Sequence, residues 1–306
     1  MIEFTPAYAR MSSEQLQERA SALRELMRAC RLCPRNCGVD RLSGELGACG
    51  AGADPIVSSY GPHLGEEAPL VGRRGSGTIF LTHCNLKCIF CQNYDISHLG
   101  RGRPMTLEEV ARMMLELQES GCHNINWVTP THQVPMLIES TRIALEQGLR
   151  LPIVYNCGGY ESLAVLRLLD GIVDIYMPDA KYGDNSAGEQ LSAVPDYWDR
   201  CREALAEMHR QVGDLQTDAD GIATRGLLVR HLVLPEEMAK TAAVMRFLAS
   251  LSPDTYVNVM AQYRPEHRAR EVSAIARPIT TAEFRRAVQE AVEAGLHRLD
   301  QRRASL

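Results

Sequence analysis

The chain has 306 residues, of which 45% are hydrophobic and 23% are charged, so its composition is that of a globular protein and excludes a disordered chain. Its net charge of −5 gives no basic surplus for binding phosphates, and we expect no nucleic acid partner. No stretch reaches the roughly eighteen apolar residues of a membrane span, and the first fifteen residues lack the apolar core of a signal peptide. We therefore expect a soluble, cytoplasmic protein that binds no membrane.

The first expected element is a helix near the N-terminus. Ser12 and Gln15 have the spacing of a capping box, which marks a helix start. Apolar residues then recur at helical spacing, at Leu16, Ala20, Leu23 and Met27. The pattern ends at a segment rich in glycine and cysteine, which runs to residue 77. Such a segment buries little apolar surface, so we expect a bound metal to hold its shape.

Four cysteines open this segment with the spacing C-x2-C-x3-C-x11-C: Cys30, Cys33, Cys37 and Cys49. Four thiolates form a complete ligand set for a tetrahedral zinc ion or for a closed [4Fe–4S] cluster, and the spacing does not distinguish the two. A chain with ten cysteines and no export signal favours metal binding over disulfides. Later in the segment, residues 63–67 could reach the mouth of the site, but we interpret them as a solvated loop.

Strands and helices alternate in the rest of the chain. The expected strands cover residues 78–81, 124–129, 152–155, 172–177, 227–234 and 256–260. The helices that follow them cover residues 106–121, 136–147, 161–169, 197–212, 238–251 and 280–295. Six such units predict an α/β fold with a parallel sheet, either an open doubly wound sheet or a partial barrel. We expect two domains, a metal-binding extension at residues 1–77 and a β/α domain at residues 78–306.

Three more cysteines follow the first expected strand: Cys84, Cys88 and Cys91. Their spacing, C-x3-C-x2-C, lets three thiolates bind one metal centre. Three ligands are one fewer than a closed zinc site or a fully protein-ligated cluster requires, so one position stays open. An open metal position at the carboxyl end of a parallel strand predicts a catalytic site. The alternatives are three buried cysteines or part of a structural zinc site.

The triad, with the aromatic Phe90 before its last cysteine, resembles the signature of radical S-adenosylmethionine (radical SAM) enzymes. The string from Gly75 to Asn93 resembles the branch related to pyruvate formate-lyase activating enzyme, and within it the homologues with an extra cysteine-rich N-terminal segment. The resemblance implies a partial TIM-like barrel of six parallel β/α units. It also implies a [4Fe–4S] cluster on the triad, with a free iron that binds S-adenosylmethionine (SAM).

The resemblance also implies SAM-binding residues at the strand ends. Phe90 corresponds to an aromatic residue that lies against the adenine. Asn156 matches a Thr-Asn-Gly turn, although the neighbouring glycines also fit an ordinary turn. Asp179 and Lys181 match an Asp-x-Lys pair that contacts the cofactor, with a surface ion pair as the alternative.

At two further positions the match to the family's SAM-binding residues is weaker. The family has a Gly-Gly-Glu motif after its second strand, where this chain has Val128-Thr129-Pro130-Thr131-His132. The hydroxyl of Thr129, the hydroxyl of Thr131 or the ring of His132 can accept a hydrogen bond from the SAM ammonium group. Arg230, in an apolar strand, needs an anionic partner, either the SAM carboxylate or a carboxylate of the protein.

These observations predict an enzyme that reductively cleaves SAM to a 5′-deoxyadenosyl radical, which removes a hydrogen atom from a substrate. Through the resemblance, we expect an activase that acts on a glycine of a partner protein. The alternatives are an enzyme that modifies a small molecule or another protein side chain, and a non-enzymatic iron–sulfur scaffold or redox sensor. The family implies a reducing partner of the flavodoxin or ferredoxin type.

Overall fold

The computed structural model describes residues 4–300. Residues 1–3 and 301–306, which belong to the two expected domains, lie outside the described part. Six parallel strands form the main sheet: β2 (Ser76–Leu81), β4 (Ile125–Val128), β5 (Ile153–Cys157), β6 (Ile175–Pro178), β8 (Ala223–Leu232) and β9 (Tyr256–Met260). The principal helices between and after them are α4 (Leu107–Glu119), α5 (Val134–Glu146), α6 (Leu163–Leu168), α8 (Tyr197–Val212), α9 (Thr241–Leu251) and α10 (Thr281–Glu293). The six predicted β/α units are confirmed.

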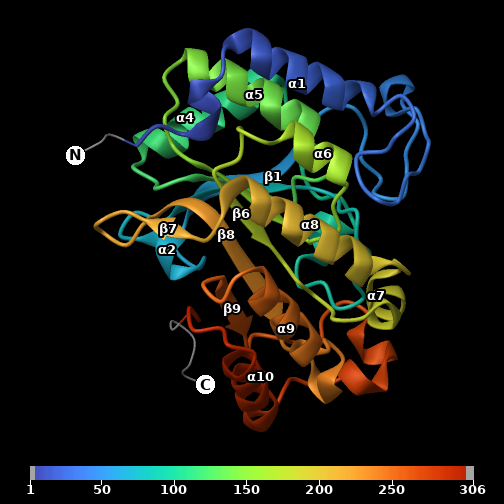
Figure 1. The fold of residues 1–306 in the computed structure, drawn as a ribbon. Coiled ribbons are helices and arrows are strands. Elements are labelled where there is room, and N and C mark those ends of the chain that lie inside the picture. Colours follow the sequence, from blue (N-terminus) through green and yellow to red (C-terminus); the bar gives the residue numbers. More distant parts are fainter. Residues whose placement is uncertain (1–3, 301–306) are drawn as a thin grey trace.

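The parallel strands pair in chain order, from β2 through β4, β5, β6 and β8 to β9. Within residues 4–300, the two end strands β9 and β2 are not paired with each other, so the barrel stays open on one side. Of the two architectures that the alternation allowed, the partial barrel is therefore the one that forms. Figure 1 shows α9 and α10 at the C-terminal end, opposite α1, α4 and α5.

Helix starts follow their capping residues. Thr106 accepts a hydrogen bond from the backbone of Glu109 while Glu109 accepts one from the backbone of Thr106, and Thr280 and Glu283 form the same pair. The predicted N-terminal helix is α1 (Ser13–Glu25), which starts with a capping box at Ser12 and packs against α5 (Figure 1). Three short helices escaped the sequence analysis, α2 (Ala68–Val71), α3 (Tyr94–Ser97) and α7 (Asn185–Ser192).

The cysteine-rich segment contributes a strand that the sequence did not predict. β1 (Ile56–His63) pairs antiparallel with β2, and its other edge pairs with the short strand β3 (Arg103–Pro104). Gly61 and Pro62 lower the strand propensity of this segment, so it becomes regular only through its pairing with β2. The short helix α2 (Ala68–Val71) then leads into β2. A further short strand, β7 (Gln216–Thr217), pairs antiparallel with β8.

The strand faces that point into the barrel meet in a small apolar cluster that includes Leu70 of α2. Its other buried members are Val154, Ile175, Met177, Leu215, Ala223 and Leu228. The carboxyl ends of the parallel strands lie beyond this cluster, and there the barrel interior becomes polar. No helix in the described part of the chain is both long and apolar enough to span a bilayer.

Candidate active site

The loop after β2, residues 82–93, carries the predicted cysteine triad. Its backbone is held by segments far away in the chain, because Lys87 and Ile89 donate backbone hydrogen bonds to the carbonyls of Ser192 and Leu191 at the end of α7. Asn85 is buried and donates its side-chain amide to the carbonyl of Tyr160, at 2.7 Å. The three thiol groups are thus presented by a loop whose conformation is fixed from several sides.

Each thiol of the triad has a polar neighbour. The sulfur of Cys88 lies 2.9 Å from the Ser192 hydroxyl, and the sulfur of Cys91 lies 3.1 Å from the Ser97 hydroxyl. The Cys84 sulfur accepts a hydrogen bond from the backbone of Leu86. Ser97 and Ser192 were not predicted, because their relation to the triad depends on the positions of α3 and α7. These hydroxyls and the amide can stabilise negative charge on sulfur.

The carboxyl ends of β5, β6 and β8 bring four predicted residues together. Arg230 donates from Nε to Asp179 at 2.8 Å and from Nη2 to the side-chain oxygen of Asn156 at 2.6 Å. Lys181 donates from Nζ to the other oxygen of Asp179 at 2.6 Å. The anionic partner that Arg230 requires is thus present within the protein, as one of the two sequence alternatives proposed.

Electrostatic interactions keep Asp179, Lys181 and Arg230 ionised. Burial alone would raise the pKa of Asp179, but the positive charges of Arg230 and Lys181 outweigh that effect and lower it. Burial would likewise lower the pKa of Lys181, and the Asp179 carboxylate raises it above its ordinary value. The two cations and the carboxylate therefore form a charged cluster at the strand ends, as catalytic and binding sites often do.

The turn after β5 allows this convergence. Gly159 has a φ of +77°, and a Cβ at this position would collide with the Asp179 carbonyl oxygen. The hydroxyl of Tyr197, from α8, lies 2.9 Å from the carbonyls of Gly158 and Asp179 and accepts a hydrogen bond from the Lys181 backbone. Tyr197 was not predicted from the sequence, since it comes from a different β/α unit. Close backbone approach at a glycine pair thus positions Asp179 and Lys181 beside Asn156.

Phe90 lies beside Asp179 and Lys181 at the strand ends. Its ring contacts Tyr182 and Tyr263 edge to face, with ring centres 6.4 and 5.8 Å apart. With Asp179 and Lys181 it lines a cavity of about 50 Å³, whose other walls are Leu232, Leu234 and Met260. A larger cavity of about 700 Å³ lies outside the barrel, between α1, α4 and α5, and none of the predicted site residues lines it.

The three candidates after β4, Thr129, Thr131 and His132, differ in their hydrogen bonding. Thr129 has a φ of +63°, which is rare for a β-branched residue, and its backbone N–H donates to the carbonyl of Asn156. Thr131 and His132 are fully buried and bond within the protein, to Glu161 and to the Thr82 carbonyl. Of the three candidates for the ammonium contact, the structure places Thr131 and His132 in internal hydrogen bonds.

Residues 63–67 correct the sequence interpretation in part, because Leu64 and Gly65 are exposed but Glu66 and Glu67 turn into the protein. The side chain of Glu66 is 9% exposed, with Oε1 3.1 Å from His63 and Oε2 3.7 Å from Arg230. Glu67 is 5% exposed and accepts a hydrogen bond from Asn258 of β9 at 2.8 Å. A polar, glycine-containing sequence is typical of a surface loop, but here Glu66 and Glu67 contact Arg230 and Asn258 of the barrel strands.

The four N-terminal cysteines lie beside the triad loop. Arg35, between Cys33 and Cys37, donates from Nε to the carbonyl of Asn85 at 2.5 Å, and Gly50 packs on the ring of His83. Backbone amides of Ala48 and Ala51 point at the sulfurs of Cys37 and Cys49, at 3.4 and 3.5 Å. Amide-to-sulfur contacts of this kind suit thiolate ligands of a metal.

Comparison with known proteins identifies the family. Residues 78–219 match the radical SAM superfamily. The chain is 32% identical over 276 residues to an uncharacterised protein, MJ0674, of Methanocaldococcus jannaschii, an alignment that covers 87% of this chain and 75% of that protein. The chain belongs to the radical SAM superfamily.

Solved structures with similar coordinates are named for diverse activities. They include Streptococcus suis SuiB bound to its precursor peptide SuiA, with 13% identity, a TM-score of 0.48, and coverage of 69% of this chain and 44% of that one. Methylornithine synthase is 19% identical, with a TM-score of 0.48 and coverage of 70% of this chain and 60% of that one. The [FeFe]-hydrogenase maturase HydG is 13% identical, with a TM-score of 0.47 and coverage of 94% of this chain and 62% of that one. The chain therefore spans from under half to about three fifths of these three proteins.

Radical SAM enzymes use a [4Fe–4S] cluster and SAM, and the donor chemistry of the triad loop fits such a cluster. Burial raises the pKa of the Cys84 thiol to about 12, so this thiol ionises only beside a compensating positive charge such as that of iron. Across residues 4–300, no three histidine, cysteine or acidic side chains converge as ligands of a single ion. Cluster thiolates each bind a different iron, so they need not converge on one point.

Proposed function

We propose that the chain holds a [4Fe–4S] cluster on Cys84, Cys88 and Cys91 and binds SAM at the iron that these cysteines leave free. When bound, the cluster supplies one electron that cleaves SAM into methionine and a 5′-deoxyadenosyl radical, which takes a hydrogen atom from the substrate. The protein residues hold and orient the reactants and exclude water. The substrate enters the barrel beside the SAM site.

The observation that carries this proposal is the convergence of the charged cluster with the triad loop. Asp179 and Lys181 line one cavity with Phe90, which directly precedes a triad cysteine. Arg230 keeps Asp179 ionised and bonds Asn156. We propose that SAM is contacted by Phe90, Thr129, Asn156, Asp179, Lys181 and Arg230. A scaffold protein has no need of buried charged side chains beside its cluster.

The resemblance to pyruvate formate-lyase activating enzyme supports a glycine of a partner protein as the site of hydrogen abstraction. A second substrate class, a small molecule or another side chain, is favoured by the buried carboxyl groups of Glu66 and Glu67. These groups line the barrel interior next to Arg230 and Asn258. Glutamates at this position suit a substrate group that carries hydrogen-bond donors.

We further propose a second metal centre at Cys30, Cys33, Cys37 and Cys49, with zinc or a [4Fe–4S] cluster as the occupant; zinc would require the four thiols to draw together, because they do not converge on a single ion in the structure. Burial raises the pKa of the Cys33 thiol to about 12, so metal binding would bring this thiol to its ionised form. Metal analysis of a variant with alanine at all three triad cysteines distinguishes the two occupants. The reducing partner is proposed to be of the flavodoxin or ferredoxin type.

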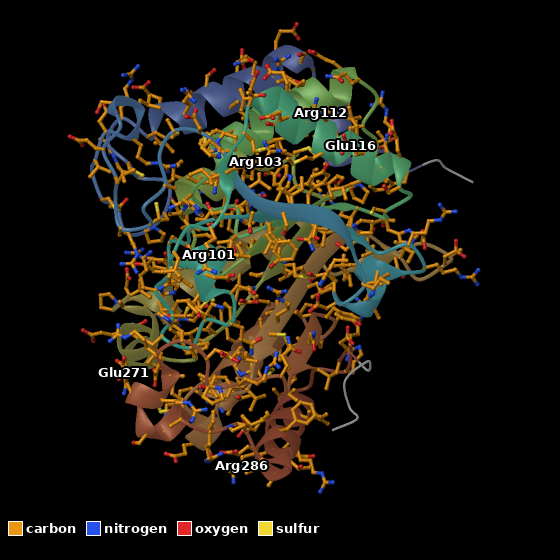
Figure 2. The ribbon with its side chains drawn as sticks, turned by 180° about the vertical axis from the view of Figure 1, so that it is seen from behind. Arg101, Arg103, Arg112, Glu116, Glu271 and Arg286 are labelled. Carbon is orange, nitrogen blue, oxygen red and sulfur yellow. The ribbon has the colours of Figure 1, made fainter. Side chains whose placement is uncertain are left out.

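Two exposed arginines lie near the triad loop, although Arg268 is ion-paired with Glu271, and we propose that such groups receive an acidic reducing partner. Arg101 is exposed shortly after the loop, and the backbone of the exposed Arg268 donates to the carbonyl of Ile89. Figure 2 shows Arg101 and Arg103 at separate places on the face that β1 crosses, and Arg103 lies 3.7 Å from Glu109.

The deciding experiment is an assay of SAM cleavage. We expect the anaerobically reconstituted protein to form 5′-deoxyadenosine from SAM when dithionite is added. Cys88→Ala should abolish this product, whereas Cys122→Ala, a buried cysteine outside both sets, should retain it. Product formation by the Cys88 variant at the wild-type rate would contradict the assignment of the cluster ligands.

A further inference from the structure

The segment between β1 and β2 closes the open side of the barrel from within. Leu70 of α2 is fully buried in the apolar cluster of the barrel interior, and its carbonyl accepts a hydrogen bond from Asn124 at 2.9 Å. One turn earlier, Glu67 is bonded to Asn258 of β9. The helix α2 therefore reaches from the strand pair β2–β4 to β9, the strands that leave the barrel open.

Glu67 is only partly satisfied at this position. Its Oε1 accepts the hydrogen bond from Asn258, but Oε2 is buried and has no hydrogen-bond partner among the described residues. Asn126 of β4 shows the same pattern, since its amide nitrogen donates to Ser76 while its oxygen is buried and unpartnered. A buried acceptor without a partner is destabilising, so the free oxygen of Glu67 points to a missing donor.

Both acceptors belong to the inside of the barrel. Asn126 is paired in register with Val154, which lies in the same apolar cluster as Leu70. Asn258 is paired with Arg230, and the next pair on that face, Leu232 and Met260, lines the cavity that Asp179 and Lys181 share. Glu67 thus lies at the level of Asn258 and Arg230, one layer deeper in the barrel than the cavity that Asp179 and Lys181 line.

The charges of this layer are unbalanced. Arg230 and Lys181 supply two permanent cations, which Asp179 and Glu66 already engage, and His63 contacts Glu66 rather than Glu67. Hydrogen bonding to His63 and the charge of Arg230 lower the pKa of Glu66 against the effect of burial. For Glu67, burial prevails and raises the pKa. A third cation beside Glu67 would neutralise its carboxylate and satisfy its free oxygen.

We propose that Glu67 binds a protonated amine or guanidinium group of the substrate inside the barrel. This inference rests on the proposed function and specifies its substrate class. Arg230, a proposed SAM contact, is paired with Asn258, so a cationic group anchored at Glu67 would present its neighbouring C–H bonds toward the cavity. The neighbouring Glu66 already contacts Arg230 and His63, so Glu67 is the carboxyl group that remains for the substrate.

The test is a binding measurement on the reconstituted holoenzyme with SAM, using agmatine and n-butylamine as probes and butyrate and n-butanol as matched controls. Isothermal titration should show binding of the two cations and none of the controls. Glu67→Gln should weaken the binding of the cations about tenfold to a hundredfold, because a charged hydrogen bond is lost. Glu119→Gln, an exposed glutamate of α4, should bind them as the wild type does.

Several results would overturn the inference. One is that no amine or guanidinium probe binds, and another is that Glu67→Gln binds the cations with wild-type affinity. A third is that Glu67→Gln loses affinity for SAM but not for the cations, which would assign the carboxyl group to the cofactor. Iron content and the unfolding temperature establish that the variant is folded, and Glu67→Asp provides a second variant that keeps the charge. Formation of 5′-deoxyadenosine tests the proposed function separately from these titrations.

Discussion

The sulfur of Cys88 shows how a residue far away in the chain can set the chemistry of a ligand. Ser192, 104 positions later, places its hydroxyl 2.9 Å from this sulfur and is itself 2.7 Å from the hydroxyl of Tyr182. The backbone carbonyl of Ser192 also accepts a hydrogen bond from Lys87 of the triad loop. One residue at the end of α7 therefore supports both the conformation of the loop and the negative charge on one sulfur.

We predict that Ser192→Ala makes the cluster harder to reduce. Removing a hydroxyl beside a thiolate removes a hydrogen bond that stabilises the reduced, more negative cluster, so the reduction potential should fall. A redox titration followed by electron paramagnetic resonance measures this potential. Ser250→Ala, at a hydroxyl on α9 that bonds only within its helix, is the control and should leave the potential unchanged. An unchanged potential in Ser192→Ala would mean that the hydroxyl does not bond to the ligand sulfur.

At the scale of elements, the site depends on how closely the ends of β5 and β6 approach each other. The paired strands bring Cys157 opposite Pro178, and the turn that follows passes against the Asp179 carbonyl. Tyr197 of α8 bridges the two strand ends through its hydroxyl. The charged cluster is therefore a consequence of strand register, a glycine turn and one tyrosine from the helix layer.

A pair of glycine substitutions separates this close approach from backbone conformation. Gly159 and Gly221 have nearly the same φ, +77° and +78°, but a Cβ at Gly221 meets no atom within 4 Å. We expect Gly221→Ala to lower the free energy of unfolding by about 1 kcal/mol, from backbone strain alone. Gly159→Ala should cost about 1–3 kcal/mol more because the methyl group overlaps Asp179. Denaturant unfolding measures both values, and equal losses would contradict the packing argument.

At the scale of the whole molecule, the N-terminal segment is bound to the barrel at several points. The backbone of Ala7 donates to Asp174 at 2.7 Å, and the other oxygen of Asp174 accepts from Ile153 at the start of β5. Arg35 bonds the triad loop, β1 extends the sheet, and α2 fills the barrel interior. The predicted boundary at residue 77 therefore lies within β2, and the extension shares a continuous core with the β/α units.

Asp174 makes the stability of this assembly depend on pH. Burial raises its pKa to about 7, above the value of 3.8 expected when the chain is unfolded, so the native state binds the extra proton between these values. The free energy of unfolding should therefore fall as pH rises from about 4 to 7, by up to about 4 kcal/mol, and level off above. Urea unfolding at pH 5.5 and 8 measures the change. In Asp174→Asn the difference between the two values should shrink; an unaltered difference would exclude this carboxyl group as its source.

Much of the architecture could be predicted from short-range patterns. The six β/α units follow from runs of apolar residues, capping boxes and glycines at helix ends, which act within a dozen residues. The triad is recognisable because its three cysteines fall within eight consecutive residues on one loop. β1 and α7 escaped prediction since their sequences favour no regular structure strongly, and pairing with β2 or packing against α8 decides their conformation.

The composition of the site beyond the triad was decided by tertiary structure. Local sequence identified Asp179 and Lys181, which lie two residues apart on one strand end, but not Ser192, Tyr197 or Glu67. Those residues reach the site only because strand order, helix position and the open side of the barrel bring distant segments together. A pattern of neighbouring residues contains no information about which remote backbone will approach it, and the physical reason is that such approach is set by the packing of the whole core.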